Sequence, residues 1–273
     1  MTERGRHPTR VDVAIEAAAA GARVAADSFR STLDVETKSN ETDFVTQADR
    51  DAQNRVVETI RDQYRDEPIV GEESGRDGAV PEAGAAWIVD PIDGTANYVA
   101  GIPTFCTAVA CTVDGDAVVA TLDFPVLGDR YVFDGDRVER NGEDVHVSDR
   151  TEPQACTVSP TLWWDRDRRE EYARACAEIV HRFADLRRVR CAQAELAMVA
   201  AGALDGTFAN VSAHPWDTVA GVAMVRAAGG TVTDLDGRPW RLDSDGIVAS
   251  NGEIHDEVLE AARAVDERAN VPR

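Results

Sequence analysis

Apolar residues recur every three to four positions in several long stretches, the spacing that places them on one face of an α-helix. The first stretch is rich in alanine and carries Ile15, Ala22 and Phe29 on that face. The second begins at Val45 and ends before Pro68, which cannot continue a helix. The predicted helices are residues 11–33, 45–67, 167–183, 192–201, 216–228 and 254–268.

Shorter apolar runs, bounded by glycine, proline and Asp-Gly pairs, indicate β-strands. Three consecutive runs in the first half favour antiparallel strands, and Asn141-Gly142 marks a hairpin turn after them. The polar segment 33–44 is expected to be a loop or a small hairpin. The predicted strands are residues 68–70, 85–89, 105–113, 117–124, 130–133, 157–159, 186–190, 205–209, 230–233 and 247–249.

The strand at residues 85–89 runs directly into acidic residues. The pattern predicts that it stops at Asp90, that the chain turns at Pro91, and that a helix begins near Thr95. Asp93 lies in the same turn, and two neighbouring acids repel each other unless a cation lies between them. Carboxylate oxygens favour Mg²⁺ or Mn²⁺, and backbone N–H groups at a helix start favour a phosphate. The turn is therefore a candidate metal and phosphate site at the carboxyl end of a strand.

With 273 residues, of which 43% are hydrophobic, the chain suffices for one large domain or two coupled halves. The order of elements changes near residue 150, from antiparallel strands to alternating strands and helices. We expect residues 1–150 to form an α+β half with a large antiparallel sheet and most metal ligands. Residues 151–273 should form an α/β half that completes the site.

The chain contains no apolar run of about 18 residues, and its polar start lacks the apolar segment of a signal peptide. Its five cysteines form no CxxC pair, as in a reduced intracellular protein, so a cytoplasmic location is expected. The histidines are scattered and form no HExxH motif, which argues against a histidine-rich zinc site.

The chain is strongly acidic, with 50 acidic against 29 basic residues, and Lys38 is its only lysine. Nucleic acids and anionic membranes need a basic surface, so neither is expected as a partner. The acids are spread along the chain rather than gathered in a tail. This favours a surface adapted to high salt, as in a halophile, over an acidic binding segment.

Two further acidic turns lie at the ends of predicted elements. Glu72 and Glu73 follow a strand, and Asp217 opens a helix. Taken alone, each is better interpreted as a solvated turn, and Asp217 as an acid that stabilises the positive end of a helix dipole. The turn at Asp90 is more specific, because two acids leave a buried strand beside a turn suited to phosphate.

Four segments, in order and at matching spacing, resemble the motifs of the inositol monophosphatase family. This family comprises lithium-sensitive, Mg²⁺-dependent phosphatases and includes archaeal fructose-1,6-bisphosphatases. The resemblance implies an α/β (α+β layered) fold with alternating helix and sheet layers, and a homodimer. The segments are Asp43-Phe44-Val45-Thr46-Gln47-Ala48-Asp49, Gly71-Glu72-Glu73, Trp87 to Thr95, and Trp216-Asp217-Thr218-Val219-Ala220-Gly221.

The resemblance also implies a set of metal ligands. Glu72, Asp90 and the main-chain oxygen of Ile92 would hold a first Mg²⁺. Asp90, Asp93 and Asp217 would hold a second, with Asp90 bridging the two ions. A third and weaker ion would lie near Glu72, and Mn²⁺ is an alternative metal.

The family pattern further assigns roles around the phosphate. Thr95 and Glu72 would orient the water on the first ion, and Asp49 would support Thr95. The backbone N–H groups of Gly94 and Thr95 would bind phosphate oxygens. Lys38 lies where the family places a lysine near the metals, although an ordinary surface lysine is the alternative.

The chain departs from the family pattern where the substrate alcohol would bind. Arg190-Cys191-Ala192 replaces the usual Gly-Ser/Thr-Ala, and Asn210 stands where inositol phosphatases place Glu or Asp. Arg190 is interpreted either as a clamp for a second phosphate, as in a sugar bisphosphate, or as the partner of a surface acid. Arg190, Ala192, Asn210 and Lys38 are thus the candidate substrate-binding residues.

Two classes of function follow. The first is a Mg²⁺-dependent phosphatase of a small phosphorylated polyol or sugar, with attack by metal-activated water. Its substrate would be an inositol phosphate, fructose-1,6-bisphosphate or a 3′-phosphonucleotide. The second is a non-catalytic metal- and phosphate-binding protein that keeps the fold. The complete set of acidic motif residues favours the enzyme.

Overall fold

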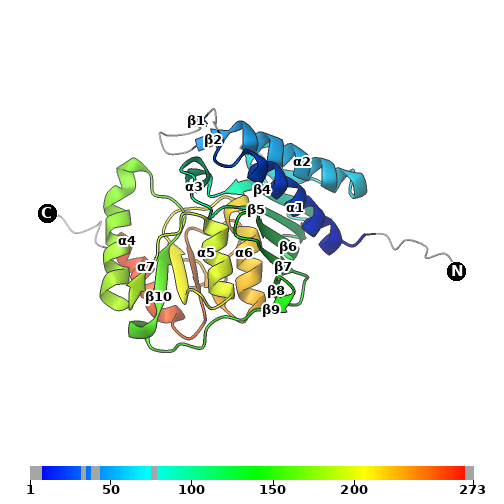
Figure 1. Ribbon diagram of the computed structural model, residues 1–273. Coiled ribbons are helices and arrows are strands. Elements are labelled where there is room, and N and C mark those ends of the chain that lie inside the picture. Colours follow the sequence, from blue (N-terminus) through cyan, green and yellow to red (C-terminus); the bar gives the residue numbers. More distant parts are fainter. Residues whose placement is uncertain (1–7, 32–34, 38–43, 75–78, 268–273) are drawn as a thin grey trace.

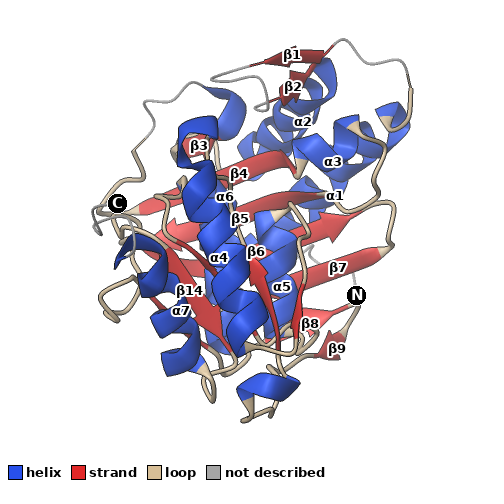
Figure 2. Cartoon of the chain, turned by 90° about the vertical axis from the view of Figure 1, so that its left-hand side faces the viewer, coloured by secondary structure: helices blue, strands red, loops and turns tan. Residues whose placement is uncertain are grey.

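The computed structural model describes residues 8–31, 35–37, 44–74 and 79–267. These residues form alternating layers of helices and sheets, which confirms the expected fold class (Figures 1 and 2). A helix pair covers one face of a seven-stranded sheet, a second pair lies between the two large sheets, and a third covers the far side. In that order the pairs are α1 (Arg10–Ser28) with α2 (Gln47–Gln63), α5 (Ala192–Ala200) with α6 (Pro215–Ala227), and α4 (Arg169–Arg182) with α7 (His255–Glu267).

The seven-stranded sheet has its strands in sequence order. Its first two strands, β3 (Ile69–Gly71) and β4 (Ala85–Asp93), are parallel, and every later neighbour pair is antiparallel. The predicted meander and the hairpin at Asn141-Gly142 are therefore confirmed. The remaining strands are β5 (Cys106–Val113), β6 (Asp116–Phe124), β7 (Asp129–Phe133), β8 (Val138–Arg140) and β9 (Glu143–Asp144).

The five-stranded sheet has the order β11-β10-β12-β14-β13 and mixes parallel and antiparallel pairs. Its strands all follow the first sheet in sequence, but α6 packs on both sheets. The division into two halves at residue 150 therefore stays a prediction. The strands are β10 (Thr157–Pro160), β11 (Asp185–Leu186), β12 (Gly206–Ala209), β13 (Thr231–Thr233) and β14 (Ile247–Ser250).

Smaller elements complete the chain. The expected small hairpin is present as β1 (Val35–Thr37) paired with β2 (Phe44–Thr46). A short helix, α3 (Thr95–Val99), begins where a helix start was predicted, and a 3-10 turn, η1 (Glu72–Ser74), follows β3. The strand predicted over residues 186–190 is wrong beyond Leu186, because the N–H groups of Val189 and Arg190 donate to a side chain of α5 and not to a strand.

Separate apolar clusters hold the layers together. Trp87 on β4 is fully buried against Val13 of α1 and against Val56 and Ile60 of α2. These contacts explain the helical periodicity that the sequence shows. A larger cluster lies around α5 and α6 between the sheets. None of the described helices is both long and apolar enough to span a bilayer. All five cysteines are free thiols.

Helices α5 and α6 approach each other closely at Gly221. A Cβ atom at this position would lie 2.4 Å from the Leu196 Cβ and 2.9 Å from the Gln193 Oε1. We predict that Gly221→Ala lowers the free energy of unfolding by about 1–3 kcal/mol, because overpacking outweighs the gain in helix propensity.

Urea unfolding in high KCl measures this change. Ala173→Ser on the exposed side of α4 is the control and should stay within about 0.5 kcal/mol of the unsubstituted protein. A Gly221→Ala protein as stable as the control would contradict the tight helix contact.

Candidate active site

An extra residue in β4 brings Asp90 and Asp93 to the same side of the sheet. Asp90 pairs with Ala108 and Asp93 pairs with Cys106, so three steps along β4 match two steps along β5. Side chains alternate along a regular strand, so residues three apart would otherwise point to opposite faces. The predicted strand end at Asp90 is therefore wrong: the strand continues through a β-bulge to Asp93.

Local hydrogen bonds fix the shape of this bulge. Pro91 has no N–H to contribute to the sheet, and its carbonyl accepts the Thr107 hydroxyl at 2.7 Å. The Ile92 N–H donates to the Asp90 Oδ1 at 3.0 Å. The Thr95 hydroxyl donates to the Ile92 carbonyl at 3.0 Å, which leaves that oxygen a second lone pair for a metal ion.

Asp90 lies at the centre of an acidic cluster. Gly71 at the end of β3 pairs with Val89, so Glu72 follows beside Asp90 at the carboxyl ends of two parallel strands. Burial raises the pKa of Asp90 well above its usual range, and the charges of Glu72, Asp93 and Asp217 raise it further. The sequence motifs are thus brought within electrostatic reach of one another.

Asp217 enters the cluster from the first turn of α6. Its N–H donates to the His214 carbonyl at 3.1 Å, and its Oδ2 accepts the His214 N–H, also at 3.1 Å. The His214 ring stacks on Trp216, with 4.6 Å between ring centroids. Asp217 therefore acts as the helix-terminal acid of the simpler interpretation and also raises the pKa of Asp90.

Asp93 is tied to the N-terminus of α5. Its carboxylate accepts the N–H of Ala192 at 3.2 Å and that of Gln193 at 2.6 Å, and the Cys191 thiol donates to it at 3.0 Å. These donors stabilise the charged form, yet burial still raises the pKa of Asp93 to about 6. The Cys191 thiol thus occupies the position of the usual family hydroxyl and contacts a predicted metal ligand.

Within the described residues, one group of three ligand-type side chains has its donor atoms within 4.8 Å of one another: Asp93, Cys106 and Cys191. Asp93 therefore has two thiols close to its carboxylate, and Cys191 is the one that donates a hydrogen bond to it.

Asp49 and Thr95 lie next to each other. The Thr95 hydroxyl lies 3.4 Å from the Asp49 Oδ1, and the other carboxylate oxygen accepts the Thr46 N–H at 2.8 Å and the Thr46 hydroxyl at 2.6 Å. Asp49 is fully buried at the start of α2. Burial raises its pKa to about 6, and the charge of Glu72 adds to the shift.

Gly94 forms the phosphate-type turn between β4 and α3. Its backbone has φ +91°, a conformation that favours glycine. A Cβ atom there would lie 3.1 Å from both the Cys191 Cβ and the Thr104 carbonyl oxygen. The sequence therefore needs glycine at this position for two independent reasons, and the first N–H groups of α3 follow it.

The predicted substrate residues have different surroundings. Asn210 is buried, accepts the Trp164 indole N–H at 2.6 Å and donates to the Glu171 carboxylate at 2.7 Å. Arg190 has its guanidinium 3.9 Å from the ring centroid of Trp163. Lys38 lies outside the described residues.

Sequence reasoning missed Gln193, which links two of the predicted metal acids. Its backbone N–H donates to the Asp93 carboxylate. Its side-chain amide donates to the Trp216 carbonyl at 2.7 Å and accepts the Gly221 N–H at 2.8 Å. It thereby connects β4 to the turn of α6 that carries Asp217. Gln193 is one of two polar residues in a helix that is otherwise apolar, and this was the available signal.

Comparison with known proteins now adds to this geometry. Residues 8–267 match the family described as the inositol monophosphatase family. The chain belongs to the inositol monophosphatase family. Membership confirms the expected enzyme class, a phosphoric monoester hydrolase of the inositol-phosphatase and fructose-bisphosphatase type, and this family is metal-dependent.

Curated relatives align with this family member over most of the length of both chains. A fructose-1,6-bisphosphatase/inositol-1-monophosphatase of Thermotoga maritima is 34% identical over 85% of this chain and 88% of its own. An inositol-1-monophosphatase of Bacillus subtilis is 30% identical over 88% and 91%. A Nus factor SuhB of Pasteurella multocida is 31% identical over 91% and 94%.

A solved structure agrees with this assignment. An inositol monophosphatase of Thermotoga maritima superposes with a TM-score of 0.87 at 30% identity, covering 95% of this chain and 98% of that one.

The donor set of the site fits the metal that the family implies. Burial and acidic neighbours raise the pKa of Asp90, and clustered carboxylate oxygens are the hard ligands that suit a divalent ion.

The raised pKa of Asp49 predicts a pH-dependent effect on stability. The unfolded chain releases this proton first, so its contribution to stability falls as pH rises from about 4 to 6 and stays unfavourable above that range. We predict that Asp49→Asn stabilises the metal-free protein by at most about 3 kcal/mol at pH 7.5 and by only about 1 kcal/mol at pH 4.5.

Urea unfolding in EDTA and high KCl at both pH values measures the effect. Asp51→Asn, exposed on the same helix, is the matched control. Equal effects of Asp49→Asn at the two pH values would show that burial does not hold the Asp49 proton.

Proposed function

We propose that this protein is a Mg²⁺-dependent phosphatase of small phosphorylated polyols or sugars. The observation that carries the proposal is the acidic cluster around Asp90, formed with Glu72, Asp93 and Asp217 beside the Gly94 turn. Glu72, Asp90 and the Ile92 carbonyl are assigned to one ion. Asp90, Asp93 and Asp217 are assigned to another. Bound Mg²⁺ would neutralise the phosphate charge and lower the pKa of a coordinated water.

The remaining residues position the reactants. The Thr95 hydroxyl and Glu72 are assigned to orient the attacking water, and Asp49, 3.4 Å from that hydroxyl, is assigned to support Thr95. The N–H groups of Gly94 and Thr95 are assigned to the phosphate oxygens at the start of α3. Phosphoryl transfer needs in-line placement and charge stabilisation more than covalent help, so this set of groups is sufficient for the reaction.

The substrate and the setting of the enzyme belong to the same proposal. Inositol phosphates and fructose-1,6-bisphosphate are the substrate candidates that the relatives' names favour. A homodimer, a cytoplasmic location and adaptation to high salt stay predictions from the sequence. The non-catalytic alternative predicts metal binding without phosphate release, so one assay separates the two classes.

The assay is release of inorganic phosphate at high KCl, with and without Mg²⁺. Inositol-1-phosphate, fructose-1,6-bisphosphate and phosphoadenosine phosphate form the substrate panel. Mg²⁺-dependent release from a polyol or sugar phosphate supports the proposal. Metal-dependent thermal stabilisation without any release supports the non-catalytic alternative.

We predict that Asp93→Asn lowers kcat at least ~100-fold. The substitution weakens binding of the ion held by Asp90, Asp93 and Asp217, which we assign to the leaving oxygen. The same variant should show a smaller rise in Tm on addition of Mg²⁺, a readout that does not depend on turnover. Asp236→Asn, an exposed acid outside the site, is the control and should retain both properties. Near-normal turnover of Asp93→Asn at saturating Mg²⁺ would refute the assignment.

A further inference from the structure

Two arginines converge on one tryptophan at the edge of the site. The guanidinium carbon of Arg190 lies 3.9 Å from the Trp163 ring centroid, and that of Arg169 lies 4.3 Å from it. Within the described part of the chain, neither guanidinium forms an ion pair or a hydrogen bond, although the chain carries 50 acids. The alternative interpretation of Arg190, as the partner of a surface acid, therefore has no support in this structure.

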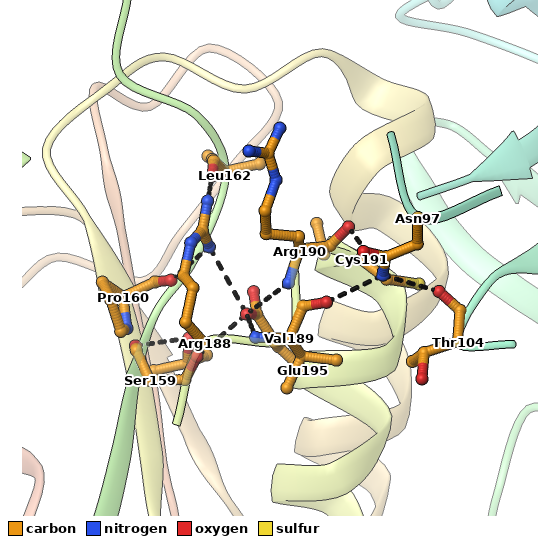
Figure 3. Close-up of polar contacts among 12 residues, drawn as sticks. Asn97, Thr104, Ser159, Pro160, Leu162, Arg188, Val189, Arg190, Cys191 and Glu195 are labelled. Carbon is orange, nitrogen blue, oxygen red and sulfur yellow. Dashed lines mark hydrogen bonds and ion pairs between the residues drawn. The ribbon is translucent and has the colours of Figure 1, made fainter. Parts of the chain in front are cut away.

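The backbone that carries Arg190 is held in an unusual conformation. Arg190 has φ +61°, in the left-handed region that non-glycine residues seldom adopt. Glu195, fully buried in α5, accepts the N–H of Val189 at 3.0 Å and that of Arg190 at 3.3 Å (Figure 3). The Arg190 side chain extends away from this carboxylate in Figure 3. Glu195 thus fixes the backbone and leaves the guanidinium to another partner.

A third arginine, Arg188, fixes the segment that leads to Trp163. Arg188 donates to the carbonyls of Pro160 and Leu162, each at 2.5 Å, and also contacts Glu195 (Figure 3). Arg188 is therefore occupied by structural contacts, whereas Arg169 and Arg190 are available to a ligand.

The backbone of Arg190 is connected directly to the Gly94 turn. Asn97 of α3 donates its amide to the carbonyls of Val189, at 2.8 Å, and Arg190, at 3.4 Å. A Cβ atom at Gly94 would lie 3.4 Å from the same Arg190 carbonyl. The backbone of Arg190 therefore lies against the turn assigned to the reacting phosphate.

The charges around Arg190 also favour an anion. Burial lowers the pKa of Arg190, and the positive charges of Arg188 and Arg169 lower it further. An anionic group placed against Arg190 and Arg169 would offset both effects, and guanidinium groups bind phosphate through paired hydrogen bonds.

We propose that Arg190 and Arg169, arranged on Trp163, form a second anion subsite that selects small polyol or sugar substrates carrying two phosphate groups. The inference rests on the proposed phosphatase function and names its substrate class. One phosphate occupies the Gly94 turn and is hydrolysed, while the other binds the two arginines and is retained in the product.

The test compares bisphosphate and monophosphate substrates in pairs. Fructose-1,6-bisphosphate is paired with fructose-1-phosphate, and inositol-1,4-bisphosphate with inositol-1-phosphate, at saturating Mg²⁺ and high KCl. The unsubstituted enzyme should prefer each bisphosphate. Arg190→Gly, which also relieves the left-handed backbone, should raise KM for the bisphosphates about 10–100-fold, and this loss should be at least about tenfold larger than any change with the matching monophosphate.

Matched variants separate this role from a structural one. Arg169→Gln should act in the same direction, whereas Arg187→Gln, an exposed arginine three residues before Arg190, should leave both substrates unchanged. Equal loss with the mono- and bisphosphates in Arg190→Gly, or no loss with either, overturns the subsite.

A binding measurement distinguishes failure of the subsite from failure of the proposed function. Calorimetry in EDTA measures binding of fructose-1,6-bisphosphate without turnover. Binding that Arg190→Gly weakens at least about tenfold supports the subsite even if no phosphate is released. Binding that the substitution does not change overturns the subsite even if the enzyme is an active phosphatase.

Discussion

Asp90 is buried at a position where the charges of Glu72, Asp93 and Asp217 all oppose its ionisation. Carboxylates in such surroundings either retain protons or require a cation, because water is not available to screen them. The four acids come from three separate parts of the chain: η1, β4 and α6. Their backbone attachments keep them close despite the repulsion, and a bound divalent ion would convert the same arrangement into a stabilising one.

The sequence predicted the layers of the fold because the apolar spacing is set by burial. Trp87, Val56 and Ile60 are fully buried where α2 packs on β4, and their positions follow the helical and strand periods. The ends of elements were harder to predict. The bulge after Asp90 continues a strand past Pro91, and it depends on pairing with β5, a segment that local pattern does not include.

The acidic ligands were visible in the sequence because they lie in compact motifs with local structural meaning. The surroundings of the ligands were not. Gln193 contacts Asp93 across 100 positions of the chain, and Trp163 approaches Arg190 from a segment that Arg188 holds by two hydrogen bonds. Such contacts depend on how the second sheet and its helices dock against the first, and neither composition nor periodicity records that docking.

The hydrogen bonds between Asp93 and α5 have a mechanical consequence. The carboxylate belongs to the seven-stranded sheet, whereas α5 also packs on β12 and β14 of the other sheet. The negative charge at that carboxylate thus fastens one layer to the next by attracting the positive end of a helix. A bound metal ion that keeps Asp93 ionised would also strengthen this contact. Metal binding and the packing of the two sheets against each other would therefore be coupled.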